Sequence, residues 1–330
     1  MLAIFSVTFP FFALILCGYV ATRRGLLPLL AIPGLNSFVL FFALPCMLYR
    51  FGASTPIAQL LDPSLVAVYA LCALLMVTLT IALTMKFEQR GCIGWNDAAF
   101  GALVAAFPNT GFMGVPLLVA LLGAQAAGPA IVTISIDMVI TSSLCIALSR
   151  LDGAGDRGVR GVRGFRGAGR ATRLALRGVL VNPLPWSIVL GALASSVAFT
   201  LPGPINTTVG LLADAASPTA LFTIGAVLAR SHINSYSGNE SQGYWPVVVL
   251  KLLIHPLLVG GVGLAAIALG AHLSRFALTV IVLVAALPSA SNVAMLAERF
   301  GADNGRIAQI ILWSTVLAFF SFSTAVAWLT

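Results

Sequence analysis

Two short stretches combine a proline with amide and hydroxyl side chains inside otherwise apolar sequence. Both open with Leu-Val-Ala-Ala, at Leu103 and at Leu283, which lie 180 residues apart. The residues that follow are Pro108, Asn109, Thr110 and Gly111 in the first stretch, and Pro288, Ser289, Ser291 and Asn292 in the second. Proline interrupts the hydrogen bonding of a helix, and in lipid the freed backbone groups need a local polar partner. Each stretch therefore predicts a helix that is broken in its middle, with polar groups at the break.

Two ionisable side chains also lie within apolar segments, where a charge costs about 2.5 to 3.5 kcal/mol at a helix centre. Asp137 follows Ile134-Ser135-Ile136. Burial disfavours its charged form, so it is a candidate proton carrier or cation ligand, with hydrogen bonding for packing as an equal alternative. Lys251 either extends to the membrane interface or is a cationic partner for Asp137 or for an anionic ligand. Asp214 is a weaker candidate of the same kind.

The composition indicates the class of protein that positions these groups. Of 330 residues, 59% are hydrophobic and only 8% are charged, which is too apolar for a water-soluble core. We expect an all-α polytopic membrane protein with ten crossings, each about 20 residues long to match a hydrocarbon layer of about 30 Å. The expected spans are 3–22, 31–50, 64–85, 97–122, 127–149, 183–201, 204–229, 246–270, 275–299 and 306–329.

The two halves of the chain repeat one pattern of prolines. The matching pairs are Pro10 with Pro185, Pro45 with Pro218, and Pro108 with Pro288. Five crossings per half would insert the second half upside down, which is the inverted-repeat plan of many secondary transporters. The alternative is that proline is simply frequent in membrane helices. The predicted divisions are a first repeat at 1–149, a linker at 150–182 and a second repeat at 183–330.

Inversion gives the two broken segments opposite directions across the membrane. The second halves of spans 97–122 and 275–299 would then both begin near the midplane, with their positive dipole ends directed into one region. Such a crossing suits a carboxylate. The predicted binding residues are Asn109, Thr110, Gly111, Ser289, Ser291 and Asn292. Two kinked helices that pack without a ligand are the alternative.

The net charge of +8 is concentrated in one place, because eight of the 18 basic residues lie between Arg150 and Arg177. Glycine and arginine recur there without a helical or strand period, which is typical of a flexible linker. The excess of positive charge on this and the other odd-numbered loops predicts a cytoplasmic central loop, with both termini outside. We favour contact with anionic lipid headgroups and expect no nucleic-acid partner.

The sequence lacks the motifs of common enzymes. It has no Gly-x-x-x-x-Gly-Lys cradle, no His-Glu-x-x-His helix and no Gly-x-Ser-x-Gly elbow, and its five cysteines form no close pair. We therefore expect neither an enzyme nor a metal site. We expect no cofactor other than a coupling ion, which would be H⁺ or Na⁺.

Four motifs resemble those of the auxin efflux carrier family, which contains plant auxin exporters and bacterial malonate-carrier-like proteins. They are Leu35 to Val39 with Pro45, Pro108 to Pro116, Lys251 to Leu257, and Leu287 to Asn292 followed by Arg299 to Asp303. The resemblance implies ten helices, a scaffold domain and a transport domain that each draw on both repeats, and elevator-like alternating access for organic anions. Asn109 and Asn292 would contact the substrate carboxylate. The second stretch departs from the first, because Ser289 occupies the position that corresponds to Asn109.

These features together predict a carrier of small organic anions such as malonate across a bacterial inner membrane, with Asp137 and Lys251 in ion or proton coupling. The expected partners are the anion, membrane lipid and, as one candidate oligomeric state, a second copy of the chain in a homodimer. The alternatives are a bile-acid-type sodium symporter and a membrane sensor that has the same fold without transport.

Overall fold

The computed structural model describes residues 2–54, 62–87, 93–149, 183–235 and 243–330. Within these ranges the regular structure is helical, apart from one isolated β-bridge. The predicted linker at 150–182 lies outside the described residues. The all-α membrane class expected from composition is confirmed.

The first half of the chain contains two long continuous helices and several shorter helices, most of them joined by 3₁₀ or π-helical turns. Its elements are α1 Leu2–Arg23, η1 Leu29–Ala31, α2 Ile32–Phe38, η2 Val39–Ala43, α3 Leu44–Ser54, α5 Pro63–Phe87, α6 Trp95–Ala106, η3 Thr110–Gly114, α7 Val115–Leu122, η4 Ala124–Ala126, α8 Ala127–Ile136, η5 Asp137–Thr141 and α9 Ser142–Ser149. Three of the short elements, η2, η3 and η5, are π-helical turns.

The second half of the chain is described from Pro183 onward. Its elements are α11 Pro183–Ser196, α12 Gly203–Ser235, α13 Trp245–Val249, η7 Leu250–Ile254, α14 His255–Ala268, α15 Arg275–Ala286, α16 Asn292–Phe300 and α17 Asn304–Leu329. The turn η7 is again π-helical and joins α13 to α14 without a gap.

Six helical segments in the described ranges are long and apolar enough to cross a membrane: Leu29–Ser54, Pro63–Lys86, Ala124–Ser149, Gly203–Arg230, Trp245–Ala268 and Asn304–Leu329. Four shorter apolar segments are Phe9–Arg23, Thr110–Leu122, Trp186–Ser196 and Arg275–Ala286. Two of the four belong to the predicted broken helices, which explains why neither is long enough by itself. The count of ten crossings stays a prediction.

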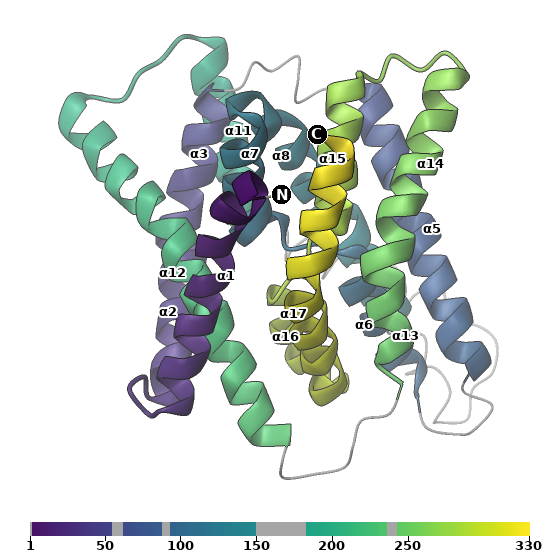
Figure 1. The fold of residues 1–330 in the computed structure, drawn as a ribbon. Coiled ribbons are helices and arrows are strands. Elements are labelled where there is room, and N and C mark those ends of the chain that lie inside the picture. The colour runs from purple at the N-terminus through teal and green to yellow at the C-terminus, as the bar shows by residue number, and fades with distance from the viewer. Residues whose placement is uncertain (1, 55–61, 88–92, 150–182, 236–242) are drawn as a thin grey trace, which may run out of the picture.

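Contacts divide the helices into two groups; in Figure 1 α1, α2, α3 and α12 lie on the left, and α5, α13 and α14 lie on the right. We call the left-hand group, α1, α2, η2, α3, α11 and α12, the lateral bundle. Its helices approach one another closely: a methyl group added at Gly225 of α12 would overlap the carbonyl oxygen of Ile15 in α1. We call the remaining helices, α5 to α9 with their turns and α13 to α17, the crossing bundle. The two bundles meet where α1 contacts α7 and α17, where α12 contacts α17 and η3, and where α3 contacts α8.

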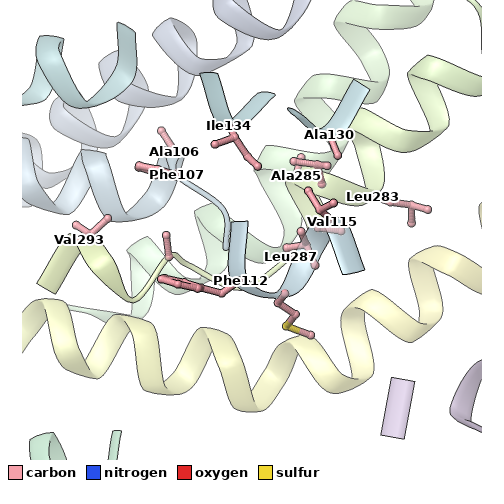
Figure 2. Packing of buried hydrophobic residues seen from close by; sticks show 14 of the residues in the cluster. Ala106, Phe107, Phe112, Val115, Ala130, Ile134, Leu283, Ala285, Leu287 and Val293 are labelled. Carbon is pink, nitrogen blue, oxygen red and sulfur yellow. The ribbon is translucent and has the colours of Figure 1, made fainter. Parts of the chain in front are cut away.

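The centre of the crossing bundle is apolar and tightly packed. Figure 2 shows Phe107 and Phe112 from one predicted break beside Leu287 and Val293 from the other, with side chains of α8 against them. Leu287 and Val293 are fully buried. Large apolar side chains on the outside, such as Leu71 of α5 and Leu257 of α14, are instead about half exposed or more. That outer surface matches a hydrocarbon environment.

Candidate functional site

The two predicted breaks are present and lie against each other. The helices α6 and α15 both run for 12 residues and end at Ala106 and Ala286. The next residue in each case, Phe107 or Leu287, has an extended backbone. A residue that precedes proline is driven out of the helical region by the proline ring, so Pro108 and Pro288 account for both helix ends.

Backbone hydrogen bonds join the two breaks into a short antiparallel bridge. The amide of Asn109 donates to the carbonyl of Pro288 at 2.8 Å, and the amide of Ala290 donates to the carbonyl of Phe107 at 3.0 Å. These bonds satisfy backbone groups that the broken helices could not satisfy internally. The crossing therefore holds together through backbone atoms, and its side chains are available for other contacts.

Several side chains at the crossing are buried without a polar partner. Asn109 is 3% exposed and Ser289 is 1% exposed, yet Asn109 Oδ1 and Ser289 Oγ accept or donate no hydrogen bond. Thr110 is fully buried, and its hydroxyl donates to the carbonyl of Pro108 at a long 3.5 Å. Buried polar atoms are normally paired, so unpaired ones mark places where water or a ligand can bind.

Ser291 and Asn292 lie on the side of the crossing that faces a pocket between the two bundles. Its polar lining residues are Asn36, Arg230, Ser291, Asn292 and Asn304, and its apolar ones are Leu40, Phe112, Val227 and Ala294. Oδ1 of Asn292 and Oδ1 of Asn304 are buried and unpaired. The six residues predicted for binding therefore divide: Ser291 and Asn292 line this pocket, and Asn109, Thr110, Gly111 and Ser289 do not.

Three polar residues of the pocket were missing from the predicted site. Asn36 belongs to the Leu35 to Val39 motif, so its position in that motif was an available signal. Arg230 directly follows the predicted span 204–229, where a basic residue indicates a loop rather than a binding site. Asn304 follows the predicted ninth crossing and carried no signal of its own. Phe112 comes from the first break, so both breaks contribute to the pocket wall.

A second polar cluster lies inside the crossing bundle, where Asp137 and Lys251 are both fully buried. Asp137 accepts hydrogen bonds from the Tyr69 hydroxyl at 2.9 Å and the Thr141 hydroxyl at 3.0 Å. Lys251 Nζ lies 3.0 Å from His255 Nδ1. The sequence did not decide whether the Lys251 side chain extends to the membrane interface. The side chain is fully buried, so it does not extend there.

The contact of Lys251 with helix α15 follows from the helix break. Its Nζ donates to the carbonyl of Ala285 at 3.2 Å. In a continuous helix that carbonyl would accept from the amide of Ser289, which here donates to Ser314 Oγ at 3.2 Å instead. A cation at the C-terminal end of a helix also interacts favourably with the helix dipole. The buried lysine thus satisfies a carbonyl that the break exposes.

Asp137 and Lys251 both lie on π-helical turns, η5 and η7. Such turns shift a side chain relative to a regular helix and occur often at functional sites. Asp214 has a different setting, because its carboxylate is exposed on α12 and pairs with Arg50 of α3 at 2.7 Å. It belongs to the lateral bundle and is not among the pocket residues.

Comparison with known proteins identifies the family of the chain. Residues 3–154 and 169–326 match the family described as "Membrane transport protein". The chain belongs to this family of membrane transport proteins. The earlier resemblance to auxin efflux carriers is thereby confirmed, and because the family consists of transporters, no enzymatic site is needed to explain the polar clusters.

Relatives in the membrane transport family come from bacteria, archaea and plants. The "Putative malonate transporter" of Rhizobium meliloti (strain 1021) is 28% identical over 96% of this chain and 93% of its own length. An "Uncharacterized transporter" of Methanothermobacter thermautotrophicus is 27% identical over 93% of this chain and 92% of its own length. "Auxin efflux carrier component 7" of Arabidopsis thaliana is 30% identical, but over only 37% of this chain and 19% of its own length.

Proposed function

We propose that this protein is a secondary-active or facilitative carrier of small carboxylates across a bacterial inner membrane. The observation that carries the proposal is the crossing of two broken helices, with unpaired amide and hydroxyl groups of Asn109, Ser289 and Asn292 around it. The name of the Rhizobium relative supports malonate as a substrate to test first. Ten crossings in two inverted repeats, with the central loop in the cytoplasm, are part of the proposal.

The chemistry of the crossing suits an anion. Helix α16 begins at Asn292, next to the break, so the positive end of its dipole faces the pocket. Amide groups can turn their NH₂ toward a carboxylate, and a hydrogen bond to a charged ligand contributes about 1.5 to 3 kcal/mol. Five of the described lining residues are polar and four are apolar. This polar share is larger than in most small-molecule sites, and it suits a charged ligand.

The division into two bundles supports alternating access as the mechanism. The pocket takes Asn36 and Arg230 from the lateral bundle and Ser291, Asn292 and Asn304 from the crossing bundle. A displacement of one bundle against the other would therefore open or close the pocket. In this mechanism the lateral bundle is the scaffold domain and the crossing bundle is the transport domain that moves as an elevator.

Uptake of labelled malonate into proteoliposomes, with and without imposed H⁺ and Na⁺ gradients, tests the proposal. We expect Asn292→Ala to lower the apparent affinity about 10- to 100-fold, because it removes an amide that lines the pocket. Asn109→Ala should lower it by a smaller factor, because Asn109 lies at the break and outside the pocket lining. Asn206→Ala, which changes an exposed residue of α12, is the matched control.

Uptake that requires Na⁺ would identify Na⁺ as the coupling ion and favour the sodium-symporter alternative. Two other outcomes would contradict the carrier function or its site. Ligand-induced thermal stabilisation without any flux would indicate a sensor with the same fold. Unchanged uptake by both asparagine variants would place the substrate site elsewhere.

A further inference from the structure

Among the side chains that the structure describes, Arg230 is the one basic residue in the lining of the pocket, and none of them in that lining is acidic. It lies on α12, five residues before the helix ends at Ser235, and is partly buried. The ion pair found in the described residues joins Arg50 to Asp214, and no carboxylate in that part of the chain lies within ion-pair distance of the Arg230 guanidinium. The pocket therefore contains a cation whose counterion is not supplied by the described residues.

The remaining polar groups of the pocket are neutral. Ser291 and Asn292 stand at the N-terminal end of α16, and Oδ1 of Asn292 and of Asn304 are buried without partners. These groups and the helix dipole can contact one carboxylate. A ligand with a single carboxylate at this position would leave the guanidinium without an anion, in a pocket that also has four apolar lining residues.

We infer that Arg230 binds the second carboxylate of a dianionic substrate, so that the site selects short dicarboxylates over monocarboxylates. The inference rests on the proposed carrier function and adds the residue that sets its substrate class. Guanidinium presents two parallel N–H groups that match a carboxylate, which makes the contact directional as well as electrostatic. The dicarboxylate would bridge α12 of the lateral bundle and α16 of the crossing bundle.

The test compares malonate with acetate in the same proteoliposome preparation. We expect Arg230→Gln to reduce the apparent affinity for malonate about 10- to 100-fold and that for acetate by no more than about threefold. Arg230→Lys should lie between wild type and Arg230→Gln for malonate, because it keeps the charge and loses the paired N–H groups. Arg275→Gln, at an exposed arginine on the first turn of α15, is the control and should leave both affinities unchanged.

The ratio of the two affinities does not depend on how much of a variant is folded, so partial misfolding of Arg230→Gln cannot imitate the expected result. An equal loss for malonate and acetate would overturn the inference, because Arg230 would then attract any anion. An unchanged malonate affinity would overturn it as well. If the wild-type protein transports neither compound nor any other carboxylate, the carrier function itself fails, and that result is distinct from a change in selectivity.

Discussion

At the scale of single residues, the two breaks use similar backbone geometry with different side chains. Asn109 and Ser289 hold equivalent positions after the two prolines, and both are buried with unpaired polar atoms. Asn292 stands three residues further along and faces the pocket. Two breaks with similar backbone geometry therefore carry different polar side chains.

The buried carboxyl of Asp137 permits a prediction about coupling. Asp137→Asn should fold normally, because its amide oxygen can still accept from the Tyr69 hydroxyl and its NH₂ can donate to the Thr141 hydroxyl. The variant cannot bind or release a proton. We therefore expect it to retain downhill uptake of malonate and to lose the stimulation of uptake by an imposed pH gradient.

Asp214→Asn is the control for this measurement, since Asp214 is an exposed carboxyl in the lateral bundle. It should leave the stimulation intact. If Asp137→Asn responds to the gradient as the wild type does, Asp137 is a packing residue. If an imposed pH gradient does not change the rate of uptake by the wild-type protein, proton coupling is ruled out.

At the scale of elements, close contacts between glycines and carbonyl groups hold the lateral bundle together. In α1, a methyl group at Gly18 would overlap the carbonyl of Phe222, and in α12 a methyl group at Gly225 would overlap that of Ile15. The two helices cross with their backbones almost in contact. Small residues at such crossings allow the close packing that drives helix association in lipid, where the hydrophobic effect contributes little.

Gly225→Ala should destabilise the protein by about 1 to 3 kcal/mol, because α1 and α12 must separate to admit the methyl group. The measurement is thermal unfolding in detergent. Gly210→Ala makes the same change in the same helix, where no atom lies within 4 Å of the added methyl group. That control should be neutral, or slightly stabilising through helix propensity. Equal melting temperatures for the two variants would contradict the close crossing of α1 and α12.

At the scale of the whole molecule, the two bundles contact each other through a limited set of helices. Phe12 of α1 and Phe319 of α17 form one such contact, with their ring centroids 5.1 Å apart. The ligand pocket lies along the same boundary. Transport by relative movement of the bundles requires this boundary to slide, whereas contacts within the lateral bundle should persist.

Cross-linking distinguishes these two kinds of contact. In a background without the native cysteines, Phe12→Cys with Phe319→Cys, joined by a short bis-thiol reagent, should abolish malonate uptake, and reduction should restore it. Arg50→Cys with Asp214→Cys joins α3 to α12 inside the lateral bundle and should leave uptake intact. Full uptake by the cross-linked Phe12 and Phe319 pair would contradict movement of the two bundles past each other.

Much of the fold follows from local signals in the sequence. Hydrophobicity alone indicates a membrane protein, because so few charged residues cannot cover a soluble core. The two breaks are equally local. A proline constrains the residue before it, so the ends of α6 and α15 at Ala106 and Ala286 follow directly from Pro108 and Pro288.

Other features depend on contacts between segments far apart in the chain, which no local pattern determines. Only the tertiary structure brings Pro108 beside Ser289, Tyr69 beside Asp137, and Lys251 beside the carbonyl of Ala285. The pocket is the clearest case, since Arg230 reads in the sequence as a loop-flanking charge. It becomes part of a site because α12 packs against the crossing bundle and carries that arginine to the start of α16.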